Sequence, residues 1–213
     1  MKLLILSGTP KKDGLSDSLA KAASEAAAAQ NAEAEIIQLT GLSVCKMCGD
    51  GWGTCISNHQ CAFGDADGFS KIQDKLRWAD AFVLITPVYW GEVSEGMKTF
   101  LDKIRRCEAT KKWDENDMSE SFFVGKSSIL VASAGGGGGG ITNTFIQMER
   151  AITHMGGASY PYDVYGFFDY IAVNRWNQDY KRETLKNAVT GLIKWYRDKT
   201  GDGSGSPGDI RTP

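Results

Sequence analysis

The chain has 213 residues, enough for one well-buried domain, with the 42% hydrophobic and 23% charged content of an ordinary globular protein. Its formal net charge of −2 gives no basic surface, which argues against nucleic acid or an anionic membrane as the main partner. No apolar run is long enough to span a bilayer and the N-terminal run is too short for a signal peptide, so we expect a cytoplasmic protein.

Short apolar runs alternate with helical patterns along the chain. Strands are expected at residues 3–6, 33–39, 79–87, 126–134 and 158–168. Helices are expected after the N-caps Ser16 and Ser94, over 69–78, and along the apolar stripes at 145–155 and 185–196. This alternation predicts an α/β fold: a flavodoxin-like three-layer αβα sandwich whose five-stranded parallel sheet has the order 2-1-3-4-5.

The expected domain covers residues 1–200, with a glycine- and cysteine-rich loop insertion at 41–68 and a flexible tail at 201–213. Residues 108–125 carry no core signal and predict a solvated excursion or lid. Within the helices we expect Cys107 to be half-buried and His154 to be a structural histidine among apolar positions. Asp102 and Lys103 are expected to cap the helix or to form salt bridges.

The first strand runs into a loop of hydroxyls, glycines and lysines, SGTPKKDGLSDS, residues 7–18. The helix that follows presents unpaired N–H groups and the positive end of its dipole, so the loop is suited to an anion. Its spacing is that of neither a nucleoside-triphosphate loop nor a GxGxxG fingerprint. The hydroxyl donors would be Ser7, Thr9, Ser16 and Ser18. The alternative is a plain βα turn.

Two further unusual loops follow strands. PVYWG, residues 87–91, offers backbone groups and the rings of Tyr89 and Trp90, which suit a flat ring system as a ligand; packing of these rings on helices is the alternative. Six consecutive glycines, residues 135–140, favour close backbone approach to a ligand, the alternative being a disordered linker. Because all three loops follow parallel strands, they should meet at the same edge of the sheet.

GTPKKDGLS, PVYWGEVSEGMKTFLDKI and SAGGGGGG resemble segments of the NADPH-dependent FMN reductase superfamily, and the resemblance runs up to Thr200. The chain departs from the usual pattern at Lys11, Leu15 and Ser16, where Arg, Asn and Thr are common. The resemblance implies an FMN site of three parts. They are Thr9, Pro10, Lys11, Ser16, Asp17 and Ser18 around the phosphate and ribityl chain; Pro87, Val88, Tyr89, Trp90 and Gly91 beside the isoalloxazine; and Ser133, Ala134, Gly135, Gly136 and Gly137 at its other polar edge.

Four cysteines, Cys45, Cys48, Cys55 and Cys61, lie at CxxC spacing and then at intervals of six and five residues. Thiolates so spaced suit a 4Fe–4S cluster or zinc, with His59 as a further candidate zinc ligand, and free redox-reactive thiols are the third alternative. The segment is similar to that of the iron–sulfur flavoprotein branch, whose usual run is CxxCxxCx5C. The insertion DGWG separates this chain from that pattern.

The resemblance implies an FMN-dependent NAD(P)H oxidoreductase that passes electrons to a quinone, nitro or azo compound, or to an iron–sulfur centre. Because the flavin carries the chemistry, we expect no obligatory catalytic side chain. The alternatives are an iron–sulfur flavoprotein that carries electrons without a small-molecule substrate of its own, and a redox or metal sensor. The resemblance also implies a homodimer or homotetramer formed across the helix after PVYWG.

Overall fold

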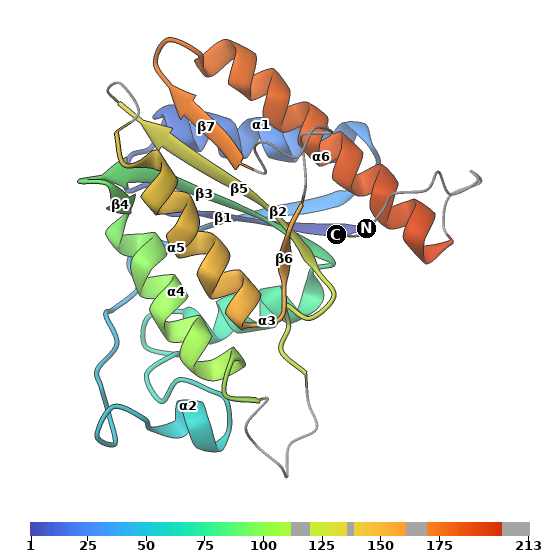
Figure 1. Cartoon of the computed structure of the whole chain (residues 1–213). Helices are drawn as coiled ribbons and strands as arrows, with labels where there is room; N and C mark the ends of the chain where they lie inside the picture. The colour runs from blue at the N-terminus through green and yellow to red at the C-terminus, as the bar shows by residue number, and fades with distance from the viewer. Residues whose placement is uncertain (112–119, 136–138, 161–169, 202–213) are drawn as a thin grey trace.

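The computed structural model describes residues 1–111, 120–135, 139–160 and 170–201 (Figure 1). None of the helices within these ranges has the length and apolar character needed to cross a membrane. In chain order the elements are β1 (Lys2–Ser7), α1 (Leu15–Ala29), β2 (Glu33–Gln38), α2 (Thr54–Ser57), α3 (Phe69–Trp78), β3 (Ala81–Tyr89), β4 (Glu92–Val93), α4 (Glu95–Glu108), β5 (Ser127–Ala134), α5 (Ile141–His154), β6 (Ala158–Ser159), β7 (Tyr170–Asn174) and α6 (Gln178–Thr200).

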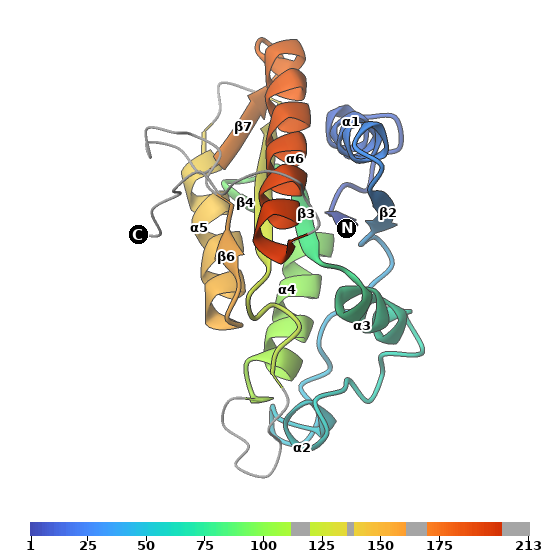
Figure 2. The same cartoon turned by 90° about the vertical axis from the view of Figure 1, so that its right-hand side faces the viewer.

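Helices cover both faces of a central sheet (Figures 1 and 2). Because alternate side chains of a strand point to opposite faces, β1 contributes to two cores. Leu3 and Ile5 pack with α1 and α6. Leu4 and Leu6 pack with α3, α4 and α5. These two cores make the three layers of the expected sandwich.

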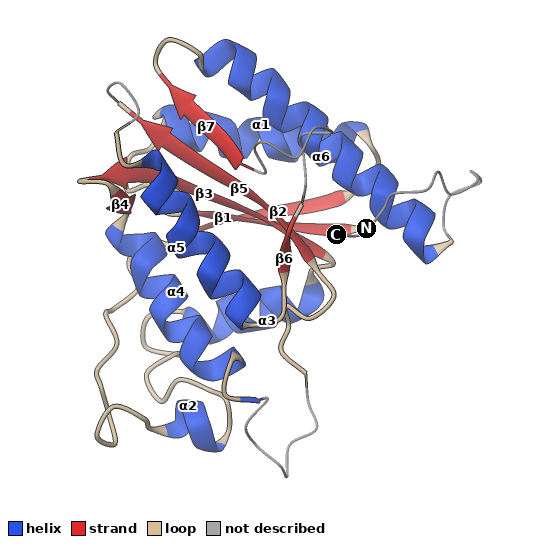
Figure 3. Ribbon diagram, viewed as in Figure 1, coloured by secondary structure: helices blue, strands red, loops and turns tan. Residues whose placement is uncertain are grey.

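The sheet has the predicted order. Its parallel strands run β2-β1-β3-β5, with β6 and β7 both beside β5, and only the short β4 is antiparallel, to β3. The register places Leu6 beside Leu84 and Leu84 beside Leu130. All parallel strands therefore end at one edge, which Figure 3 shows as the side to which the arrowheads of β5 and β7 point. The order 2-1-3-4-5 is confirmed.

The bounds of the fifth strand were wrong. A strand was expected at 158–168, whereas β6 covers only Ala158 and Ser159, and the carboxyl half of β5 pairs with β7, residues 170–174. The reason is that Ile171 and Val173 supply the buried apolar pair that this position of the sheet requires. Residues 161–169 lie outside the described residues.

The expectation of a solvated stretch at 108–125 holds for the exposed Glu120, Val124 and Gly125 but was wrong for other described residues. Glu108, Lys111 and Phe123 are buried. The carboxylate of Glu108 forms an ion pair with Lys111 Nζ at 3.1 Å and accepts a hydrogen bond from the backbone N–H of Phe122 at 2.8 Å. Charges that pair with each other can be buried, and a sequence pattern does not show that pairing. Residues 112–119 lie outside the described residues.

Two smaller expectations were also wrong. Cys107 is completely buried rather than half-buried, because it faces the core from α4. His154 is exposed, one helical turn beyond the exposed Arg150, because the apolar stripe of α5 lies on another face of the helix. By contrast, Ser94 caps α4 as predicted, with its side chain accepting a hydrogen bond from the N–H of Met97.

A buried ion pair attaches α4 to the start of α3. Lys103 Nζ lies 2.5 Å from Asp67 Oδ2, and the two side chains are 2% and 4% exposed. The same carboxylate accepts hydrogen bonds from the N–H groups of Ser43 and Phe69. Burial alone would raise the pKa of Asp67, but the hydrogen bonds from Lys103, Ser43 and Phe69 outweigh it and lower the pKa. The salt-bridge role predicted for Lys103 is confirmed.

We predict that Lys103→Ala lowers the free energy of unfolding by about 3 kcal/mol, because it leaves a buried carboxylate without its counter-ion. Lys98→Ala is the matched control, since the Lys98–Asp102 pair at 2.6 Å is exposed and should contribute less than about 1 kcal/mol. Urea unfolding at pH 7 measures both values. Equal losses in the two variants would contradict the assignment.

The same pair predicts a pH dependence. Because folding lowers the pKa of Asp67, its contribution is complete above the unfolded value of about 4 and is lost as the pH falls through the folded value. The stability difference between the unmodified protein and Lys103→Ala should therefore shrink below about pH 4. A difference that stays constant down to pH 2 would show that Asp67 does not carry it.

Candidate functional site

The first loop begins with a buried polar atom that lacks a partner. Ser7 ends β1 and is completely buried, yet its Oγ makes no hydrogen bond within the described part of the chain. The loop then returns to Gly14, which precedes α1 without any side-chain cap. A buried hydroxyl and an uncapped helix start together leave several donors for an anion.

Ser16 has a different role from the one expected. Gly14, in extended conformation, occupies the N-cap position, so Ser16 lies within the first turn of α1. Its Oγ is 2.7 Å from Ser133 Oγ at the end of β5, and both residues are buried. This hydrogen bond joins the first loop to the third across 117 positions of sequence. The prediction that Ser16 is the N-cap was wrong. The hydrogen bond does bring together two serines that were both predicted to belong to the site.

The remaining side chains of the first loop mainly shape the loop. Thr9 Oγ1 accepts a hydrogen bond from the N–H of Lys11, and Ser18 Oγ donates to the carbonyl of Leu15. The Asp17 carboxylate accepts from the N–H of Asp13 and from Lys21, and the hydrogen bond from Lys21 lowers the pKa of Asp17. Pro10 and Lys11 are exposed.

The second loop is a tight hairpin. Val88 pairs with Val93 and Tyr89 with Glu92, which leaves Trp90 and Gly91 as a two-residue turn. Both turn residues have positive φ, 52° and 82°, as a type I′ hairpin requires. Pro87 is buried within β3, whereas Trp90 at the tip is fully exposed. The hairpin thus presents its aromatic residue to solvent at the carboxyl edge of the sheet.

Ser94 connects this second loop to the first. Its Oγ donates to the carbonyl of Gly8 at 2.6 Å, and the Thr86 hydroxyl lies within 3.2 Å. A Cβ on Gly8 would lie 2.5 Å from Ser94 Oγ and 2.9 Å from Met97 Cβ, so only glycine allows this approach. The sequence pattern identified Ser94 as a cap but gave no signal for this second role.

The third loop contacts the second. A Cβ on Gly140 would overlap with the Cα of Gly91, and Asn143 Nδ2 donates to the carbonyl of Gly91 at 2.8 Å. Ser133 and Ala134 are buried at the end of β5, and Gly135 is exposed. Gly136 and Gly137 lie outside the described residues. The first loop is thus joined to the end of β5 through Ser16 and to the start of α4 through Ser94, and the third loop contacts the second. This is the meeting at one edge that their positions after parallel strands predict.

The arrangement suits a ligand with one anionic group and one flat ring. The N–H groups at the uncapped start of α1 and the unpartnered hydroxyl of Ser7 would donate hydrogen bonds to the anion. The hairpin with Tyr89 and Trp90 would border the ring. The residues present therefore fit FMN.

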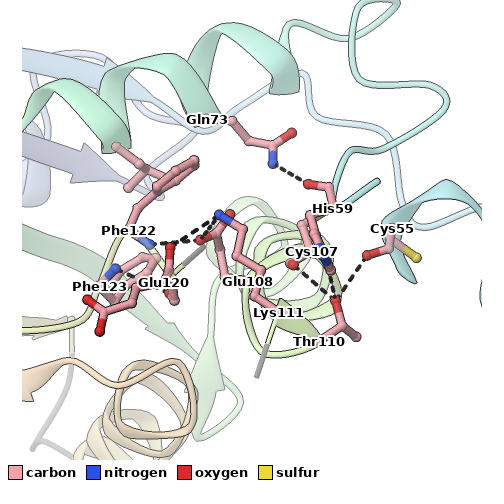
Figure 4. Close-up of polar contacts among 12 residues, drawn as sticks. Cys55, His59, Gln73, Cys107, Glu108, Thr110, Lys111, Glu120, Phe122 and Phe123 are labelled. Atoms are coloured by element: carbon pink, nitrogen blue, oxygen red, sulfur yellow. Dashed lines mark hydrogen bonds and ion pairs between the residues drawn. The ribbon is translucent and has the colours of Figure 1, made fainter. Parts of the chain in front are cut away.

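The cysteine segment, residues 41–68, runs along α4 toward its C-terminal end, where α2 lies (Figure 2). Figure 4 shows the polar contacts that fix it there. Thr110 Oγ1 lies 3.0 Å from the Cys55 carbonyl and 3.2 Å from His59 Nδ1. Gln73 Nε2 donates to the carbonyl of His59. The segment is held mainly by hydrogen bonds to its backbone, and these bonds do not involve the thiols.

Cys45, Cys48, Cys55 and Cys61 are all described, free and half-buried. Within the described ranges no three His, Cys, Asp or Glu side chains form a group that could hold a metal ion. Cys55 and Cys61 lie near the buried Cys107, whose pKa is raised first by burial and further by these two thiols. The described cysteines as placed do not form a cluster site.

Comparison with known proteins identifies a family. The model of a family described as NADPH-dependent FMN reductase matches residues 1–167. An iron–sulfur flavoprotein of Methanocaldococcus jannaschii is 32% identical over 107 residues, 49% of this chain and 52% of that protein. The chain spans about half the length of the curated relatives it matches.

Solved structures show the fold. An NADH:FMN oxidoreductase in its apo form aligns with a TM-score of 0.62 at 14% identity, covering 91% of this chain and 89% of that one. A Fusobacterium nucleatum flavodoxin bound to flavin mononucleotide aligns with a TM-score of 0.59 at 13% identity, covering 91% and 98%. At these identities the likeness supports the flavodoxin-like architecture alone.

We predict that Gly140→Ala weakens FMN binding about tenfold or more, because its Cβ would force the second and third loops apart and its φ of 81° disfavours alanine. Gly139→Ala is the matched control one residue away, where a Cβ meets nothing within 4 Å. Fluorescence titration with FMN measures both affinities. Equal affinities would show that this contact does not shape the site.

Proposed function

The chain belongs to the NADPH-dependent FMN reductase family, and on this premise we propose that it is an FMN-dependent oxidoreductase. Its proposed electron donor is NADPH or NADH, and its proposed acceptor a small molecule such as a quinone, nitro or azo compound. One observation carries the proposal: the first of the loops that meet at the sheet edge contains an uncapped helix start and the unpartnered hydroxyl of Ser7.

The proposed role of the protein is to bind FMN and to orient it toward the electron donor and acceptor. Bound FMN would supply the hydride chemistry. Ser7 Oγ and the first-turn N–H groups of α1 would hold the phosphate, with Lys11 and Lys12 exposed beside them. Ser133 Oγ, hydrogen-bonded to Ser16, would keep the third loop close to the first. Tyr89 and Trp90 would border the ring and set the access of donor and acceptor.

Reconstitution and turnover test the proposal. The protein is saturated with FMN, and oxidation of NADPH and of NADH is followed with a quinone, a nitro compound and an azo compound in turn. We expect stoichiometric FMN and turnover with at least one donor and acceptor pair. Failure to bind FMN would refute the flavin site, whereas bound FMN without turnover would refute the reductase activity alone.

A second candidate function is electron transfer through FMN and an iron–sulfur cluster. The names of the curated relatives and the four cysteines favour it. Cluster assembly would require the cysteine segment to rearrange, because no metal-binding group forms among the described residues. Iron and sulfide analysis of protein purified without oxygen decides this: four of each per chain would support the carrier, and their absence would leave the reductase.

We predict that Ser7→Ala weakens FMN binding about tenfold, because it removes a buried donor to a charged phosphate. Ser128→Ala is the matched control: Ser128 is also completely buried with an unpartnered Oγ, but it lies near the amino end of β5. Both variants should be as stable as the unmodified protein. Isothermal titration with FMN separates them, and equal affinities would place the phosphate elsewhere.

A further inference from the structure

A fourth loop, residues 175–177, follows the parallel strand β7 at the edge of the sheet where the other three loops meet. Asn174, the last residue of β7, pairs with Ala134, so β7 and β5 end side by side (Figure 3). The fourth loop therefore begins one strand spacing, about 4.8 Å, from the start of the third loop. The match to the family model ends at residue 167, before this loop.

The fourth loop is shaped by two asparagine side chains. Asn174 Oδ1 accepts hydrogen bonds from the N–H groups of Trp176 at 2.9 Å and Asn177 at 3.1 Å. Asn177 Oδ1 accepts in turn from the N–H of Asn174 at 2.7 Å. These bonds fix the turn without using the side chains of Arg175 and Trp176. Both of those side chains are exposed, so they can contact a ligand without a change in the turn.

The side chains that this part of the chain presents to solvent are aromatic and basic. Trp176 is 65% exposed, and Tyr180 at the start of α6 is 72% exposed. The Arg175 guanidinium lies 4.3 Å from the centre of the Trp176 ring, and Lys181 Nζ lies 5.6 Å from that of Tyr180. A flat apolar face beside a positive charge suits a ligand with both an aromatic ring and an anionic group.

The local charge also favours an anion. Residues 175–182 contain three basic side chains and one carboxylate, that of Asp179. Asp179 lies 3.1 Å from Arg182, so these two charges largely cancel. Among the residues that the structure describes, no carboxylate forms an ion pair with Arg175. The positive charge of Arg175 is therefore available to a ligand.

We propose that the fourth loop selects NADPH over NADH, with Arg175 binding the 2′-phosphate of NADPH and Trp176 stacking on its adenine. This inference rests on the proposed function, because it names which electron donor the flavin site uses. The two donors differ only in the 2′-phosphate. Arginine is suited to that group, because its planar fork binds two phosphate oxygens at once.

The position of the loop fits the two ends of a dinucleotide. The nicotinamide end has to reach the flavin ring beside the hairpin, which extends from β3. Strand β5 lies between β3 and β7, so the hairpin strand and the fourth loop are two strand spacings, about 10 Å, apart. A dinucleotide with its nicotinamide at the hairpin can therefore place its adenosine end at Arg175 and Trp176.

The first experiment is titration calorimetry of the full chain saturated with FMN, with NADP⁺ and NAD⁺ as probes. We expect NADP⁺ to bind about tenfold or more tightly than NAD⁺. Arg175→Gln should remove this difference by weakening NADP⁺ binding alone. Trp176→Ala should weaken the binding of both nucleotides to a similar extent, because both carry adenine. Both residues are exposed, so FMN content and thermal stability should not change.

The second experiment follows anaerobic reduction of the bound FMN by NADPH and by NADH in a stopped-flow instrument. Arg175→Gln should lower the second-order rate constant for NADPH about tenfold and leave that for NADH unchanged. Arg77→Gln is the matched control. Its guanidinium is also exposed beside an aromatic ring, 4.6 Å from that of Phe122, but it lies on α3 at the amino edge of the sheet.

The outcomes separate this inference from the proposed function. No reduction of FMN by either nucleotide would refute the proposed function and this inference with it. Reduction by both nucleotides at equal rates, equal affinities for NADP⁺ and NAD⁺, or a preference that survives in Arg175→Gln would overturn this inference alone. So would a change of oligomeric state in Arg175→Gln by size-exclusion chromatography, since the loop would then be a contact between two copies of the chain.

Discussion

The hydroxyl of Ser94 is the contact on which the edge of the sheet depends. In one position it caps α4, donates to the carbonyl of Gly8 and lies beside Thr86 at the end of β3. A hydroxyl can do all three only where the chain comes very close, and that closeness exists because Gly8 has no side chain. The position of α4 relative to the first loop therefore follows from two small residues rather than from the large apolar core beneath them.

Helix α4 also separates two regions of different character. Its N-terminal end is part of the loops at the sheet edge. Lys103 in its C-terminal half, and Thr110 just beyond its last residue, hold the cysteine segment. With 14 residues at 1.5 Å rise, the helix places its ends about 20 Å apart. The side of α4 toward α5 carries the exposed Lys98–Asp102 ion pair and Arg105 beside the buried Leu101. One helix thus borders both the loops and the cysteine segment.

Much of the fold could be predicted from the sequence, because apolar runs and helical stripes are local signals. The confirmed strand order and the meeting of the loops both followed from that alternation. Ser16 and Ser133 could not be paired in advance, since their hydrogen bond spans 117 positions. The burial of Glu108 and Lys111 was also hidden, because it depends on mutual charge neutralisation. The cysteine spacing indicated ligands, yet spacing alone does not determine where a long insertion places its thiols.

Trp90 lowers the stability of the folded state at this edge of the sheet. It is a bulky residue at φ 52°, fully exposed at the tip of a hairpin, where Asn or Gly would fit the backbone with less strain. An indole in that place contributes little to folding and raises the energy of the turn. Selection for stability alone would have replaced it, so its presence means that the native state is less stable than this backbone permits. The free energy of unfolding is therefore lowered by a surface residue that lies beside the loops that would bind the cofactor.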